Sequence, residues 1–202
     1  LGDFGSTPPA RHEHVGVSRE DVVILTSVEH DHVDIYPSPE VYEAQFAEML
    51  RSLPEEGLVA CDARDARARA LVKEHARSRV AFYGLDGDET GDVTPTWSAA
   101  LVSPDPVTGV QPFDVFAGGS SCGRFALGVP GAHNVRNALG AIAACAEGFG
   151  VGIEASRRAL ASFQGVRRRQ DLLGEPGGVA VYDDFAHHPA TPRGARSPAS
   201  RP

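Results

Sequence analysis

The sequence predicts an α/β fold that combines a mostly parallel sheet and helices with a small antiparallel side sheet. Between residues 22 and 83, short apolar runs alternate with amphipathic stretches, which is the pattern of parallel strands joined by helices. Residues 93–127 instead contain brief apolar runs separated by Pro, Gly, Asp and Ser, which is typical of antiparallel strands joined by turns. The two patterns together define the predicted fold class.

The first half of the chain should supply three parallel strands and two helices. We expect strands over residues 22–28, 57–61 and 80–83, because each is a short apolar run. We expect a helix over residues 40–52, where apolar side chains recur at helical spacing, and another over residues 63–77, which are rich in Ala and Arg. This alternation favours a parallel sheet.

The second half should begin with the antiparallel strands and continue with helices and one further strand. The runs SAALVS, FDVFA and RFALGV predict the antiparallel strands. Residues 133–149 and 153–163 carry apolar side chains at helical spacing, so we expect two helices there. The run 179–182 then predicts a strand that starts a new unit.

Composition excludes several classes of protein. With 202 residues, 42% of them hydrophobic, and a net charge of -8, the chain can bury a core in one or two globular segments but is a poor candidate for binding nucleic acid. Cys61, Cys122 and Cys145 are odd in number and lack CxxC spacing, so neither a disulfide framework nor a zinc site is indicated, and a reducing cytoplasm fits best. No apolar run approaches the roughly 18 residues of a membrane helix.

The first group of candidate functional residues follows the first predicted strand directly. Ligands of open α/β sheets bind outside the carboxyl ends of the parallel strands, where this loop should lie. Carboxylates with an imidazole suit a hard divalent ion that keeps several waters better than they suit a caged zinc. A helix-capping polar loop is the alternative. The group consists of Thr26, Ser27, Glu29, His30, Asp31, His32 and Asp34.

The second group is a pair of asparagines at the start of a predicted helix. In PGAHNVRNALGAIAAC, Asn134 and Asn137 are three residues apart, so one helical turn aligns their side chains. Carboxamides pair donors with acceptors and can read a purine edge, and the amino end of a helix adds free N–H groups. Alternatively, Asn134 serves only as a helix cap.

The third group combines three arginines with later acidic and imidazole side chains. Planar guanidinium groups suit phosphate oxygens. The acidic residues follow the predicted strand 179–182, where a functional loop would begin. A solvated basic turn and a polar loop are the alternative. The residues are Arg167, Arg168, Arg169, Asp183, Asp184, His187 and His188.

Four motifs, in this order and at these separations, resemble the Mur ligase family: TSVEHDHVDIY, PGAHNVRNALGAIAA, FQGVRRRQ and VYDDFAHHP. The resemblance implies an ATP-dependent ligase of peptidoglycan synthesis, in which a substrate carboxylate attacks the terminal phosphate of ATP and an amine then attacks the acyl phosphate. DDFAHHP and HVDIY look closest to the branch that joins L-Ala-γ-D-Glu-meso-diaminopimelate to UDP-N-acetylmuramate. The branch that adds L-alanine is the near alternative.

The resemblance also implies roles for individual residues and two cofactors, ATP and Mg²⁺. His32 matches the family's magnesium-binding histidine, and Asn134 and Asn137 match the pair near the adenine, with Asn137 favoured for the base. Arg169 matches the arginine that approaches the nucleotide phosphates, and Asp184 the hinge aspartate near the ribose. The roles of the two histidines that follow, at 187 and 188, stay open.

The resemblance divides the chain into four parts. We expect an irregular stub over residues 1–15, the central ATP-binding domain over 16–163, the hinge and the start of a Rossmann-like C-terminal domain over 164–189, and a disordered or out-of-frame tail over 190–202.

The family's glycine-rich Gly-Lys-Thr phosphate loop has no counterpart in the sequence. The single lysine, Lys73, lies in a predicted helix without a glycine run, so we expect the phosphate loop upstream of Leu1. The chain is then a fragment or frame-shifted product, expected to be inactive alone, or a non-catalytic relic that binds nucleotide weakly. An unrelated α/β nucleotide-binding module is the third alternative.

Overall fold

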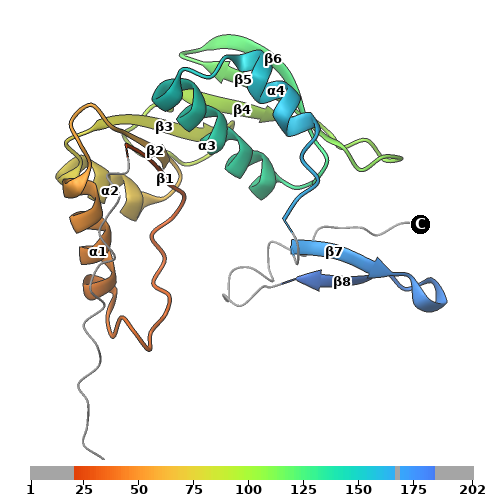
Figure 1. Cartoon of the computed structure of the whole chain (residues 1–202), viewed down its shortest axis with the longest axis horizontal. Helices are drawn as coiled ribbons and strands as arrows, with labels where there is room; N and C mark the ends of the chain where they lie inside the picture. Colours follow the sequence, from red (N-terminus) through yellow and green to blue (C-terminus); the bar gives the residue numbers. More distant parts are fainter. Residues whose placement is uncertain (1–20, 167–168, 185–202) are drawn as a thin grey trace, which may run out of the picture.

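The computed structural model describes residues 21–166 and 169–184, and its main feature is one six-stranded sheet (Figure 1). The strands follow chain order across the sheet; β1 to β4 run parallel, whereas β4, β5 and β6 pair antiparallel. This arrangement confirms the predicted fold class, and the antiparallel strands extend the parallel sheet itself. The strands are β1 (Val22–Leu25), β2 (Leu58–Asp62), β3 (Arg79–Leu85), β4 (Trp97–Leu101), β5 (Gln111–Ala117) and β6 (Ser120–Leu127).

Helices cover both faces of the sheet. On one face, α3 (Ala132–Phe149) lies across the strands and α4 (Ile153–Ala161) packs on β6 and α3 (Figure 1). On the other face, α1 (Pro39–Ser52) and α2 (Ala66–His75) pack beside each other. Successive residues of β2 join different cores, because strand side chains alternate between faces. Ala60 packs in the α3 core, whereas Cys61 packs in the core of α1 and α2.

A separate two-stranded hairpin follows the helices. It consists of β7 (Arg169–Gly174), the short 3-10 turn η1 (Pro176–Gly178) and β8 (Val181–Asp184). The sequence predicted a strand at 179–182 but not β7, since the charged run RRRQD lacks the alternation of a half-buried strand. Asp183 and Asp184 end β8 instead of opening the loop after it, which corrects the predicted boundary.

Two boundaries near the sheet edge also differ from prediction, and both involve Asp65. Strand β1 ends at Leu25, and the buried Val28 beyond it donates its N–H to Asp65 Oδ2 at 3.3 Å. Helix α2 begins at Ala66 because Asp65 Oδ1 accepts the N–H of Ala68 at 2.7 Å, which caps the helix. The residues between β2 and Asp65 therefore form a loop.

The cysteines and the single lysine can be placed where the structure describes the chain. All three cysteines are free. Lys73 lies in α2, where its Nζ pairs with Asp92 Oδ1 at 2.5 Å. No helix within the described ranges has both the length and the apolar character to cross a bilayer.

Close packing fixes α3 on the sheet at Gly140. A Cβ added to this glycine would lie 2.8 Å from Cζ of Tyr83, whose side chain is fully buried on β3. The tyrosine ring cannot move aside without disturbing the core around it. The glycine therefore sets how closely the helix approaches β3.

We predict that Gly140→Ala destabilises the protein by about 1–3 kcal/mol through overpacking, reduced by up to about 1 kcal/mol from better helix propensity. Urea denaturation followed by circular dichroism measures the difference. A variant as stable as the wild type, or more stable, would show that the helix shifts freely over Tyr83.

Candidate functional site

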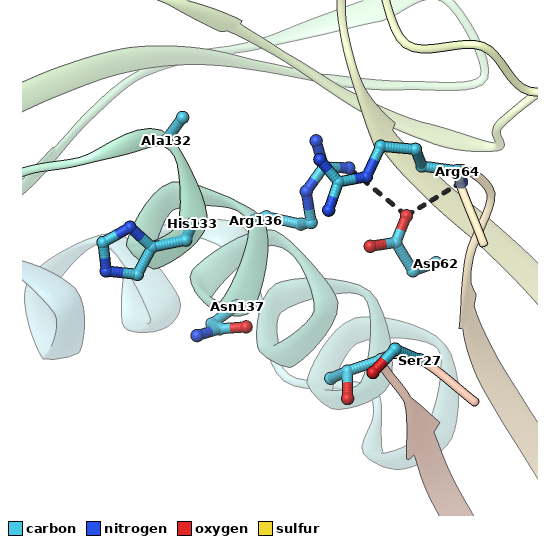
Figure 2. A pocket seen from close by; sticks show the side chains of 8 residues that line it. Ser27, Asp62, Arg64, Ala132, His133, Arg136 and Asn137 are labelled. Carbon is cyan, nitrogen blue, oxygen red and sulfur yellow. Dashed lines mark hydrogen bonds and ion pairs between the residues drawn. The ribbon is translucent and has the colours of Figure 1, made fainter. Parts of the chain in front are cut away.

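A cavity of about 400 Å³ lies beside the carboxyl ends of β1 and β2 (Figure 2). The first turns of α3 form its opposite wall. Open α/β sheets bind their ligands at this end of the parallel strands. The lining residues are Thr26, Ser27, Asp62, Arg64, Ala132, His133, Arg136 and Asn137.

A buried ion pair holds the cavity wall together. Arg136 Nη1 and Nη2 donate to the two carboxylate oxygens of Asp88 at 2.6 and 2.8 Å, and Nη1 also donates to Asp62 Oδ1 at 3.2 Å. Arg136 is 8% exposed and Asp62 2%. One guanidinium thus joins α3 to the end of β2 and to the turn after β3.

Burial and hydrogen bonding shift the two aspartates in opposite directions. Burial raises the pKa of Asp62, and the hydrogen bond from the Arg64 N–H and the charge of Arg136 offset only part of that rise. Burial also acts to raise the pKa of Asp88, but hydrogen bonds from Arg136 and the Leu85 N–H outweigh it and lower the pKa. Acidification therefore favours the folded state through Asp62 and disfavours it through Asp88.

The two predicted asparagines face different surroundings. Asn137 is exposed and lines the cavity (Figure 2). Asn134 lies outside the lining and donates its side-chain amide to the carbonyl of Pro130 at 2.8 Å. Gly131, with φ 111°, precedes the helix, which has no side-chain cap. Asn134 thus supports the turn into α3, while Asn137 is placed to meet a ligand.

The predicted metal loop lies outside the cavity lining, apart from its first two residues, Thr26 and Ser27. His32 has a left-handed backbone, with φ 53°, and its side chain is 57% exposed. His30 closes the loop, since its Nε2 lies 2.8 Å from the carbonyl oxygen of Tyr36 and its ring packs against Tyr42. The loop therefore has a defined shape around His32.

Within residues 21–166 and 169–184, no three His, Cys, Asp or Glu side chains converge on a metal position. Single protein ligands suit Mg²⁺, which keeps several waters and binds through one or two carboxylates and substrate phosphates. Glu29 and Asp34 are exposed and Asp31 is half-buried beside His32, with 4.0 Å between Asp31 Oδ2 and His32 Nε2. The residues present fit such an ion, not a protein-built cage.

The hairpin places one arginine and one aspartate of the third group opposite each other. Arg169 in β7 and Asp184 in β8 are directly opposed in the strand register. The other arginines and the histidines of this group, at 167, 168, 187 and 188, lie outside the described residues.

Sequence reasoning missed four polar cavity residues: Asp62, Arg64, His133 and Arg136. The signal for Arg136 lay in α3, where it shares a face with Gly140 and Ala143, both small and buried. An arginine on such a face needs a buried acidic partner. Arg64 was missed because the helix was predicted to start at residue 63, which placed it on a solvated helix face.

The fold and the cavity define an α/β domain with a cavity at the carboxyl ends of its parallel strands, where sheets of this kind bind their ligands. A comparison with protein families matches residues 5–145 to the Mur ligase middle domain. The chain therefore belongs to the Mur ligase family, through its middle domain.

Named relatives include ligases of two kinds. A UDP-N-acetylmuramate–L-alanine ligase of Rubrobacter xylanophilus is 40% identical over 166 residues, which cover 82% of this chain and 34% of the relative. The UDP-N-acetylmuramate–L-alanyl-gamma-D-glutamyl-meso-2,6-diaminoheptandioate ligase of Haemophilus influenzae is 35% identical, over 83% and 34%. The chain spans about a third of the length of these relatives.

Solved structures of both kinds share the fold. The UDP-N-acetylmuramate–alanine ligase of Thermotoga maritima is 26% identical with a TM-score of 0.66, over 87% of this chain and 37% of that chain. The murein peptide ligase of Psychrobacter arcticus is 28% identical with a TM-score of 0.61, over 85% and 33%. These matches agree with the mixed α/β sheet described above.

We predict that Arg136→Met destabilises the protein by about 3–5 kcal/mol, because it leaves Asp62 and Asp88 buried without their cation. Arg124→Met is the matched control: Arg124 likewise donates two hydrogen bonds to the carboxylate of one aspartate, Asp114, but its side chain is 60% exposed. That control should lose about 1 kcal/mol or less. Chemical denaturation compares the two, and equal losses would contradict a special role for the buried pair.

We predict that Asp88→Asn flattens the acid sensitivity of folding. Because Asp88 has a lowered pKa, it stabilises the fold above the ordinary aspartate range and loses this effect as pH falls through and below about 4. The unfolding free energy, measured between about pH 5 and 3, should fall less steeply in the variant. Asp86→Asn, which removes the same charge at an exposed position two residues earlier, is the control, and an equal change of slope in both variants would contradict a specific effect of the pairing of Asp88 with Arg136.

Proposed function

We propose that the chain is the nucleotide-binding middle segment of an ATP-dependent ligase that joins an amino acid or peptide to UDP-N-acetylmuramate. Membership of the Mur ligase family supports the reaction class. The observation that carries the nucleotide role is Asn137, exposed on α3 in the wall of a cavity at the carboxyl ends of the parallel strands. Its carboxamide offers a donor and an acceptor to a purine edge.

In this proposal Asn134 and Asn137 have different roles at the adenine. Asn137 contacts the base, and Asn134 holds the start of α3 through its bond to Pro130 while its amide oxygen stays available as an acceptor. In this arrangement the shape of the turn before α3 decides where the base-reading amide lies.

His32, Arg169 and Asp184 serve the phosphate and ribose end of the nucleotide in this proposal. His32 holds Mg²⁺, which supplies charge stabilisation at the phosphoryl oxygens when bound. Arg169 binds the phosphates and Asp184 the ribose, and their opposed positions in the strand register let one hairpin present both. Residues 16–163 then form the central domain, and 164–189 the hinge and the start of the C-terminal domain, to which the hairpin belongs.

For the amino substrate we favour the tripeptide L-Ala-γ-D-Glu-meso-diaminopimelate, on the motifs DDFAHHP and HVDIY. L-Alanine is the second candidate, and the 40% identity to the Rubrobacter xylanophilus L-alanine ligase favours it. In this proposal the cavity serves the nucleotide, so selectivity between the two amines should arise elsewhere.

We predict that Asn137→Ala weakens binding of a non-hydrolysable ATP analogue at least about tenfold, since one to two hydrogen bonds to the base are lost. Isothermal titration calorimetry on the whole chain measures the affinity. Asn134→Ala is the comparison: it should lower thermal stability, because it removes the bond to Pro130, and lower affinity less. No analogue binding by the wild type, or an unchanged affinity in Asn137→Ala, would overturn the proposed nucleotide role.

A further inference from the structure

We propose that Arg64 is a phosphate-binding residue of the cavity, a role that rests on the proposed nucleotide function and extends it to a residue on the loop after β2. Arg64 is exposed and lines the cavity. In Figure 2 its side chain extends from the end of β2 toward the region above Asp62 that the Arg136 guanidinium also occupies. Its positive charge acts on both Asp62 and Asp88, which places the guanidinium near this cluster.

The buried ion pair leaves the Arg64 guanidinium available to a ligand. Asp88 is engaged by two hydrogen bonds from Arg136, and Asp62 Oδ1 accepts from Arg136 and from the backbone N–H of Arg64. Across the described ranges, the Arg64 side chain forms no ion pair of its own. Over the same residues its side chain forms no hydrogen bond either, so its N–H donors are available to a ligand in the cavity.

The charge balance of the cluster allows an anionic ligand only while Arg64 is present, because Arg64 brings the cluster to formal neutrality. Asp62 and Asp88 together exceed the charge of Arg136 by one negative unit, and Arg64 offsets that unit. Without Arg64 the cavity would repel an anion. With Arg64 in place, the same space is surrounded by its planar guanidinium, by the hydroxyls of Thr26 and Ser27 and by the amino end of α3.

A phosphate group suits these donors better than other anions do. A guanidinium binds two phosphate oxygens in a fork, and serine and threonine hydroxyls add further donors. The alternative role for Arg64 is a solvated charge that only neutralises the two aspartates. In that case a lysine would replace it fully, because charge alone would matter.

The test measures binding of inorganic tripolyphosphate to the whole chain by calorimetry at low salt. Arg64→Gln should weaken this binding about tenfold or more, and Arg64→Lys should restore it only in part. Arg67→Gln is the matched control: it removes the same charge from an arginine that is 55% exposed and faces Glu43 at 3.6 Å, outside the cavity. That control should change the affinity less than about twofold.

Three outcomes would overturn the role of Arg64: no tripolyphosphate binding by the wild type, equal losses in Arg64→Gln and Arg67→Gln, or full rescue by lysine. Adenosine, which has no phosphate, tests the proposed nucleotide function separately through Asn137. If Arg64→Gln weakens tripolyphosphate binding but the wild type does not bind adenosine, the role of Arg64 is supported and the nucleoside site is overturned. If the wild type binds adenosine but not tripolyphosphate, the nucleoside site is supported and the role of Arg64 is overturned. Where both hold, ADP and UDP distinguish an adenine from a uridine nucleotide as the source of the phosphate.

Discussion

The ion pair of Arg136 with Asp62 and Asp88 is the constraint on which the arrangement of the site depends. A cation in the first turns of α3 lies near the positive end of the helix dipole, which is unfavourable, and a buried charge is costly unless it is paired. The fold meets both demands with two carboxylates, one at the end of β2 and one in the turn after β3. The start of α3 and the end of β2 must therefore keep one relative position. Asn137, the residue after Arg136 in α3, accordingly keeps its place in the cavity wall.

The loop that carries His32 is held by different forces. Val28 is tied to Asp65, the cap of α2, and His30 is tied to the carbonyl of Tyr36 beside an aromatic cluster. This loop therefore depends on hydrogen bonds between single side chains and the backbone and on ring packing, whereas the cavity wall depends on an ion pair. Different interactions therefore hold the cavity wall and the loop that carries His32, although both lie at the same edge of the sheet.

The sequence predicted the fold class and most elements because apolar periodicity is strong in the strands and in α3. It also placed Asn137 correctly beside a helix start. It could not place Arg64, because the start of α2 depends on the cap at Asp65, which only the structure reveals. Nor could it pair Arg136 with Asp62 and Asp88, which lie 74 and 48 residues away along the chain. Local patterns do not encode such long-range contacts.

The left-handed backbone of His32 has a consequence for protein engineering. A φ of 53° suits glycine or asparagine, whereas other residues pay about 1–2 kcal/mol in that region. A sequence optimised for thermal stability alone would therefore favour glycine or asparagine at this position and remove the imidazole. Stability-driven redesign of this domain would erase a candidate metal ligand while appearing to improve the protein.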